Sequence, residues 1–285
     1  MSQVSVAFES QAILGECPLW SRSRNRLLWV DTLAPALNMF DPASGENEAI
    51  PVAGPLGFVA EREGDLFLGV GCDIAQLATD GAVRKITSAP HAAPGFRLND
   101  ARFDARGRLW VGLMDETLTE GSGRLYRFDN DGQWRECDRG FTLINGLGWS
   151  PDNRTLYVTD SRRGEIYAYD FDLDTGAIDN RRVWFRMEIA EGKPDGLLVD
   201  AHGYVLSVLF DGAAILRLAP DGGRVGRTEL PVSRPTSCAL SPDGGCLYVT
   251  TARLGLSTAE LADAPWSGAL LALPYPSGFS GAPDG

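Results

Sequence analysis

Short runs of alternating apolar and polar residues recur along the whole chain, and turns rich in Gly, Asp, Asn or Arg separate them. Such runs are typical of half-buried β-strands joined by tight turns. Six units repeat the order of strand, polar turn and second strand, and most are followed by a hairpin-like stretch such as ALNMFDPASGE or GRLYRFDNDGQ. The units begin at Gly15, Gly54, Asn99, Asn145, Asp195 and Thr236. Each unit therefore holds about four strands within roughly 40–50 residues.

This repeat predicts an all-β fold, a six-bladed β-propeller with four-stranded antiparallel blades. The run VSVAF (Val4–Phe8) is a spare strand, whereas the last unit ends in GALLALP (Gly268–Pro274) and is short of strands. We therefore expect the N-terminal strand to complete the last blade, because ring closure protects sheet edges. The alternative is a β-sandwich with coincidental spacing. Only STAELADAP, near Ser257, has a helical pattern, and it is short.

Composition narrows the possible surroundings and partners. No linker divides the chain, so residues 1–275 are predicted to form a single propeller domain and residues 276–285 a flexible C-terminal tail. The sequence has neither an apolar run long enough to span a membrane nor a signal-peptide pattern, so we expect a cytoplasmic protein. A net charge of −12 argues against nucleic-acid and membrane partners. The five cysteines are odd in number and lack CxxC spacing, which indicates reduced thiols.

One polar position recurs when the units are aligned on the apolar residue that ends the first strand. Equivalent positions in a propeller are related by rotation about the central axis, so their side chains should converge in the channel. Two carboxylates buried together repel each other, and a cation removes that cost. Oxygen-only ligands favour Ca²⁺, Mg²⁺ or Mn²⁺ over thiophilic metals; the alternative is ordinary turn residues. The aligned residues are Glu16, Pro55, Asn99, Asn145, Asp195 and Thr236.

Histidine is scarce, which limits the possible mechanisms. The only two, His91 and His202, lie in loop or turn contexts, and no GxSxG motif is present. A general base is therefore expected to be a carboxylate rather than an imidazole.

A family resemblance is carried by ECPLW, RLNDARFDARGRLWVGLM, INGLGWSPDNRTLYVTDS, KPDGLLVDAHG and TSCALSPDGGCLYVTTARLGL. These stretches resemble the regucalcin/gluconolactonase/luciferin-regenerating-enzyme-like family, of the bacterial sugar-lactonase type. The resemblance covers about Leu14 to Leu273, and the R-x-N-D, N-G-L-x-W-S-x-D and P-D-G motifs occur in family order. It implies a six-bladed, metal-dependent propeller that is often a lactonase.

The resemblance also implies a set of site residues. Metal ligands would fall on Glu16, Asn145 and Asp195, and Asp195 is also the proposed catalytic base. Substrate contacts would fall on Arg97, Asn99 and Glu116, with Asp160 behind the site. Two departures stand out: Cys17 replaces a glycine common in the family, and Thr117 replaces an acidic residue that touches the sugar in some members.

Together these features predict hydrolysis of a sugar lactone, as a small-molecule substrate, to the aldonic acid in carbohydrate catabolism. The cofactor would be one divalent metal ion, with Ca, Mg, Mn, Zn and Fe left open. Three alternatives remain: another metal-assisted ester hydrolysis, such as that of aryl esters or organophosphates; a non-enzymatic divalent-metal-binding regulator; and an interaction propeller with an inert channel.

Overall fold

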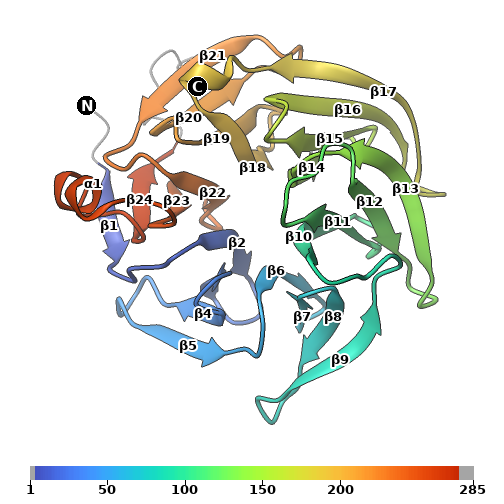
Figure 1. Ribbon diagram of the computed structural model, residues 1–285, viewed down its shortest axis with the longest axis horizontal. Coiled ribbons are helices and arrows are strands. Elements are labelled where there is room, and N and C mark those ends of the chain that lie inside the picture. The colour runs from blue at the N-terminus through green and yellow to red at the C-terminus, as the bar shows by residue number, and fades with distance from the viewer. Residues whose placement is uncertain (1–3, 276–285) are drawn as a thin grey trace.

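Residues 4–275 are described by a computed structural model, in which 24 strands form six four-stranded antiparallel sheets around a central axis (Figure 1). The six-bladed propeller predicted from the repeat is confirmed, and the sandwich alternative is wrong. Blade 1 contains β2 (Gly15–Ser21), β3 (Arg26–Asp31), β4 (Ala36–Phe40) and β5 (Asn47–Pro51). Blade 2 contains β6 (Leu56–Arg62), β7 (Asp65–Val70), β8 (Asp73–Leu77) and β9 (Val83–Ser88).

Blades 3 to 5 repeat the same outward order of strands. Blade 3 contains β10 (Phe96–Phe103), β11 (Leu109–Asp115), β12 (Gly123–Phe128) and β13 (Trp134–Phe141). Blade 4 contains β14 (Ile144–Trp149), β15 (Thr155–Asp160), β16 (Glu165–Asp172) and β17 (Ala177–Arg186). Blade 5 contains β18 (Lys193–Val199), β19 (Val205–Phe210), β20 (Ala214–Leu218) and β21 (Arg224–Glu229). A 3-10 turn at Ile189–Glu191 precedes blade 5.

The two ends of the chain share blade 6. Its strands are ordered β1 (Ser5–Phe8), β24 (Leu270–Pro274), β23 (Cys246–Thr251) and β22 (Pro235–Leu240). Ser5 pairs with Ala272 in an antiparallel register, and Figure 1 shows β1 beside β24. The prediction that the N-terminal strand completes the last blade is confirmed. The predicted tail, residues 276–285, lies outside the described residues.

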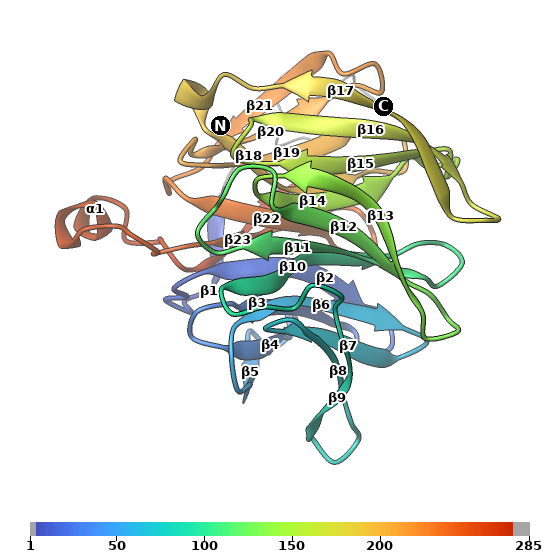
Figure 2. The same cartoon turned by 45° about the vertical axis from the view of Figure 1, so that its right-hand side comes forward.

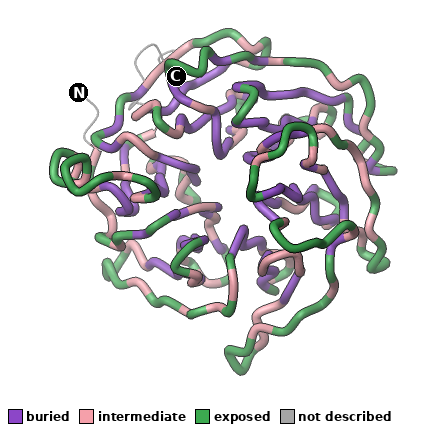
Figure 3. Tube along the Cα trace, in the orientation of Figure 1, coloured by how far each residue is buried: buried purple, intermediate pink, exposed green. Residues whose placement is uncertain are grey.

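The core lies between the blades, because each sheet buries both faces against its neighbours. Every residue of β11 is buried, whereas the outermost strands, such as β9, are largely exposed (Figure 3). The helix predicted near Ser257 forms as α1 (Thr258–Asp263), with a capping box between Ser257 and Glu260. It buries no residue and projects from the ring (Figure 2). No helix within residues 4–275 has the length and apolar character needed to cross a membrane.

Every innermost strand is interrupted by a β-bulge near the end that enters the channel. In β10, the pairs Leu98–Leu113 and Ala101–Val111 leave two residues, Asn99 and Asp100, opposite a single partner. A bulge re-aims the side chains that it contains. Its recurrence therefore turns a polar side chain towards the axis in blades 3, 4 and 5. The bulges of β14 and β18 begin at Asn145 and Asp195.

Glycine follows the polar residue in two of these bulges because neighbouring innermost strands almost touch. A Cβ atom on Gly146 would lie 2.2 Å from the backbone nitrogen of Leu197 in the next blade. One on Gly196 would lie 2.7 Å from the Cα atom of Ser237. The Asn-Gly and Asp-Gly pairs therefore combine a side chain for the channel with room for the next strand.

The pairing corrects the sequence alignment in two blades. The bulge of β6 contains Gly57 and Phe58 instead of the aligned Pro55, and the bulge of β2 begins at Cys17, one residue after Glu16. Hydrophobic pattern alone cannot locate an extra residue within a strand, which explains both shifts. Cys17 has φ +48°, a left-handed conformation that glycine adopts most easily.

Removal of residues 1–8 should destabilise the ring, because β24 would lose its partner and expose an unpaired edge. The lost ladder bonds and apolar contacts should cost about 2–4 kcal/mol, and each kcal/mol should lower the melting temperature by about 2–4 °C. Circular dichroism melts with light scattering measure both stability and aggregation. A chain lacking only residues 1–3 is the control, since it keeps β1. Equal melting temperatures for the wild type and the two shortened chains would show that β1 contributes nothing to closure of the ring.

Candidate active site

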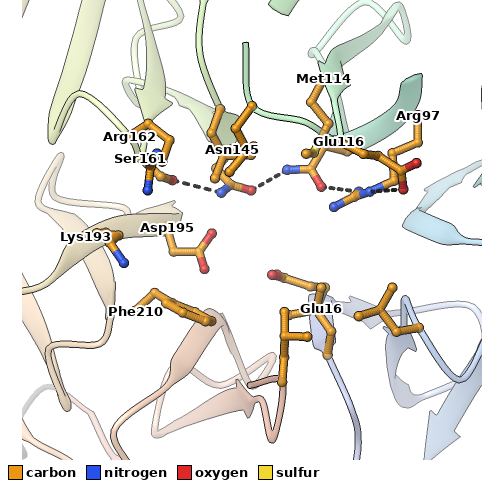
Figure 4. Close-up of a pocket in the computed structure, with 16 residues that line it drawn as sticks. Glu16, Arg97, Met114, Glu116, Asn145, Ser161, Arg162, Lys193, Asp195 and Phe210 are labelled. Atoms are coloured by element: carbon orange, nitrogen blue, oxygen red, sulfur yellow. Dashed lines mark hydrogen bonds and ion pairs between the residues drawn. The ribbon is translucent and has the colours of Figure 1, made fainter. Parts of the chain in front are cut away.

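A pocket of about 310 Å³ lies in the central channel and receives residues from every blade except blade 2. Its floor comes from the bulged ends of the innermost strands, and its rim comes from loops that follow the second strands. All six residues predicted from the sequence line it together: Glu16, Arg97, Asn99, Glu116, Asn145 and Asp195 (Figure 4).

One half of the floor is a chain of hydrogen bonds across blades 3 and 4 (Figure 4). Arg97 donates from Nη1 to Asn99 Oδ1 at 2.5 Å, and Asn99 donates from Nδ2 to Asn145 Oδ1 at 2.5 Å. The Asn99 amide also donates to the carbonyl oxygen of Ile144 at 2.8 Å, and Asn145 Nδ2 donates to Ser161 Oγ at 2.8 Å. Both amides are thereby fixed in orientation, with their oxygens towards blade 3.

The other half of the floor holds two carboxylates, Glu16 and Asp195, that point into the same space (Figure 4). Asp195 is only 4% exposed, and its Oδ1 atom has no hydrogen-bond donor. Burial raises the pKa of Asp195, and the nearby Asp100 carboxylate raises it further. Burial also raises the pKa of Glu16, with repulsion from Asp195 as the next cause. Two negative charges are therefore held here only at a considerable electrostatic cost.

The oxygen atoms of the floor fit a divalent cation. The Oδ1 atom of Asp195 accepts no hydrogen bond, and a carbonyl oxygen such as Asn145 Oδ1 has a second lone pair after one hydrogen bond. Among residues 4–275, no three His, Cys, Asp or Glu side chains gather in a metal-binding group. A cation would therefore need the Asn145 amide besides Glu16 and Asp195. Asn99 uses both N–H donors within the floor, so it is better suited to holding Arg97 and Asn145 in place.

Cys17 and Asp100 pack directly beneath the floor. The buried Cys17 Sγ donates to Asp100 Oδ1 at 3.0 Å. Burial is the main cause that raises the pKa of both groups, and Asp100 raises the pKa of the thiol further. Cys17 is therefore a neutral packing residue and not a nucleophile. Its left-handed backbone costs about 1–2 kcal/mol relative to the glycine that the family favours.

The wall beside Arg97 carries Glu116, whose Oε1 atom lies 3.8 Å from Arg97 Nε. The Glu116 side chain is 46% exposed, so it is accessible from the pocket mouth. Thr117 instead donates from Oγ1 to Asp115 Oδ1 at 2.7 Å and does not line the pocket. The sequence departure at Thr117 therefore lies outside the pocket wall.

Asp160 lies behind the pocket. Its buried carboxylate accepts the backbone N–H groups of Thr142 at 2.8 Å and Leu143 at 3.1 Å. These bonds fix the turn that leads into β14, which carries Asn145. Asp160 thus positions site residues without entering the cavity.

Sequence reasoning missed most of the rim. The missed signal is a second recurring position, at or just after the end of the second strand of several blades. It supplies Leu33, Arg162, Phe210 and Leu254 as well as Glu116, which the family resemblance had already implied. Neither His91 nor His202 lines the pocket. His91 instead contacts the Tyr126 hydroxyl at 2.6 Å.

The fold and the pocket define a class: a six-bladed propeller whose channel holds a small-molecule site with two carboxylates opposite an amide network. The chain belongs to the SMP-30/gluconolactonase/LRE-like family, whose model matches residues 14–253. Chicken (Gallus gallus) regucalcin is 34% identical over 90% of this chain and 88% of its own. A 6-deoxy-6-sulfogluconolactonase from Pseudomonas putida is 33% identical over 92% of this chain and 91% of its own. The crystal structure of a calcium-binding protein, regucalcin, from Agrobacterium tumefaciens has a TM-score of 0.91 with 24% identity, covering 95% of this chain and 93% of that one.

Asp195→Asn should stabilise the cation-free protein at neutral pH. Because folding raises the pKa of Asp195, the unfolded carboxyl loses its proton first, and stability falls as pH rises from about 4 through the raised value. The asparagine amide does not ionise, so the variant does not lose stability in this way. Its melting temperature at pH 7 in chelator should therefore be higher than that of the wild type. The two curves should converge towards pH 4.

Calcium titration then separates charge relief from cation binding. Calcium should raise the melting temperature of the wild type by mass action, and Asp195→Asn should need a higher calcium concentration for the same rise. Asp65→Asn, at an exposed strand end, should follow the wild type throughout. A lower melting temperature for Asp195→Asn at pH 7 in chelator would contradict the assigned repulsion.

Proposed function

We propose that this protein hydrolyses a sugar lactone to the aldonic acid, with one divalent cation held by Glu16, Asn145 and Asp195. The observation that carries the proposal is the pair of facing carboxylates, Glu16 and the buried Asp195, with the unpaired Asp195 Oδ1 opposite a fixed amide network. Membership of the family and the similarity to a Pseudomonas putida protein named as a lactonase support it. The cation is one of Ca, Mg, Mn, Zn or Fe, and the regucalcin relatives favour calcium.

The side chains have distinct roles in this reaction. A bound divalent cation polarises a lactone carbonyl and lowers the pKa of a water molecule. Asp195 binds the cation through one carboxylate oxygen, its unpaired Oδ1, and takes the proton of the attacking water at the other. Arg97, held by Asn99, directs N–H donors towards the substrate and favours negative charge on its carbonyl oxygen. Water adds to the carbonyl carbon, the acyl–oxygen bond then breaks, and the ring oxygen takes up the proton held by Asp195 and leaves as a hydroxyl group. Glu116 binds sugar hydroxyls at the mouth.

A carboxylate base agrees with the distribution of histidines. Both His91 and His202 lie outside the pocket lining. A general base works best when its pKa is near the working pH. The raised pKa of Asp195 belongs to the cation-free site, and a bound cation would lower it again by favouring the charged carboxylate.

The rim favours a second candidate, hydrolysis of a more apolar ester on the same floor. Leu33 and Leu254 line the mouth and are 40% and 38% exposed. Exposed apolar side chains beside a pocket suit an apolar substituent. The predicted cytoplasmic location and catabolic role remain part of the first proposal.

A lactone panel with and without chelator tests the reaction. Glucono-, galactono-, xylono- and arabinonolactones should be hydrolysed with release of acid, followed by pH-stat. Chelation should abolish turnover and added divalent cation should restore it. Turnover that survives complete chelation, or a trapped acyl-enzyme, would contradict the mechanism. Cleavage of aryl esters alone would favour the second candidate.

Two substitutions separate the roles of the floor residues. Asp195→Asn should lower kcat by about 10²–10⁴-fold even at saturating cation, because general-base assistance is lost. Asn145→Asp adds a charge and should tighten cation binding while weakening activation of the carbonyl. Asp65→Asn is the control. Recovery of wild-type kcat by Asp195→Asn at saturating cation would show that Asp195 is only a ligand.

A further inference from the structure

One side of the pocket is cationic, although the chain carries a net charge of −12. Arg97 lies against Glu116, and Glu16 and Asp195 form the carboxylate half of the floor. Two further cations remain on the wall that blades 4 and 5 supply, Arg162 and Lys193 (Figure 4). We call these two residues the cationic wall.

Arg162 has no carboxylate partner among residues 4–275. Its neighbour Arg163 differs, because its guanidinium lies 3.4 Å from Glu120 and 3.5 Å from Asp160. Arg162 is exposed at the pocket mouth, so its N–H donors are accessible to a ligand. A guanidinium binds carboxylate or phosphate oxygens in a planar, bidentate manner.

Lys193 is held beside the pocket by a shared carboxylate. Asp211 accepts Lys193 Nζ at 2.6 Å and Arg234 Nε at 2.7 Å, so one negative charge serves two cations. Both cations also lie near the Phe210 ring, at 5.8 Å and 5.2 Å from its centroid. The ammonium keeps donors beyond the one that Asp211 accepts. The group is therefore fixed in position while part of its charge remains uncompensated.

A neutral lactone carries no negative charge that could pair with the two cations of this wall. The carboxylate produced by hydrolysis forms at the carbonyl carbon, next to the buried floor, whereas Arg162 is exposed at the mouth. Leu143 and Phe210 also line the pocket, and apolar surroundings strengthen the attraction between opposite charges. The Arg162 end of the wall is therefore suited to an anionic group far from the reacting carbonyl, whereas Lys193 lies nearer the floor and also attracts the Asp195 carboxylate.

We propose that Arg162 and Lys193 bind an anionic substituent of the substrate, so that the preferred lactone carries a carboxylate or phosphate at the end remote from its carbonyl. This inference rests on the proposed lactone hydrolysis and names its substrate class.

The test compares matched lactones that differ at one end. D-Gluconolactone is the neutral probe, a glucarolactone carries a carboxylate at carbon 6, and 6-phosphogluconolactone carries a phosphate there. An alkyl-substituted γ-lactone represents the apolar alternative. The wild type should show a kcat/KM about 10-fold higher for an anionic probe than for the neutral one, mainly through KM. The better of the two anionic probes identifies the anion.

Arg162→Gln should lower the ratio of anionic to neutral kcat/KM by about 10-fold, since a charge-assisted hydrogen bond is lost. Arg154→Gln is the matched control, because it removes the same charge at the opposite end of β15. It should leave the ratio at the wild-type value. An unchanged ratio in Arg162→Gln, or a preference for the alkyl lactone, would overturn the inference while lactone hydrolysis stands.

Calorimetry provides a readout that needs no turnover. D-Glucarate should bind the wild type more tightly than D-gluconate, with a difference that shrinks at high salt and in Arg162→Gln. If no lactone is hydrolysed, the proposed function fails. In that case the calorimetric comparison alone tests whether the cationic wall binds an anion. Equal affinities for D-glucarate and D-gluconate would overturn the inference.

Discussion

The close approach of six innermost strands around one axis is the constraint on which the site depends. At the bulges, the strands of neighbouring blades are so near that a Cβ atom on Gly146 or Gly196 would meet the next backbone. The preceding residue is turned into the channel, so the packing that closes the ring also directs Asn145 and Asp195 inward. Site and scaffold therefore share one geometric cause, and a substitution in the bulge would disturb both.

The floor shows how this scaffold accommodates a local electrostatic penalty. Glu16 and Asp195 are held with raised pKa values and without hydrogen-bond donors at Asp195 Oδ1. On the other side, Arg97, Asn99 and Asn145 are tied into one hydrogen-bonded chain. A positive ligand gains the most binding free energy beside the two carboxylates, because their repulsion is then relieved. The hydrogen-bonded half of the floor stays rigid whether or not the ligand is bound. Such a division is typical of a binding site that is formed before its ligand arrives.

The sequence predicted the propeller and the pocket floor well, because both follow from a repeated pattern. The alternation of apolar residues predicted the six blades, and the recurring Glu, Asn and Asp position predicted four floor residues. The alignment failed at Pro55 and shifted at Glu16, because a bulge inserts a residue without changing the hydrophobic pattern. Arg162 and Lys193 were missed because an exposed cation beside a strand has no distinguishing pattern until its partners are known. Most of the fold was therefore predictable, whereas the wall that would select the substrate was not.

The pairing of β1 with β24 has a consequence for biosynthesis. Ser5 in β1 is synthesised long before its partner Ala272 in β24. The backbone of Leu254 donates to Ile13 at 2.9 Å across the same junction, and Leu14, the next residue, lines the pocket together with Leu254. A growing chain can therefore form five blades while the sixth and the pocket remain incomplete. Contacts so distant in sequence form late in folding, so the pocket is completed only after blade 6 has closed.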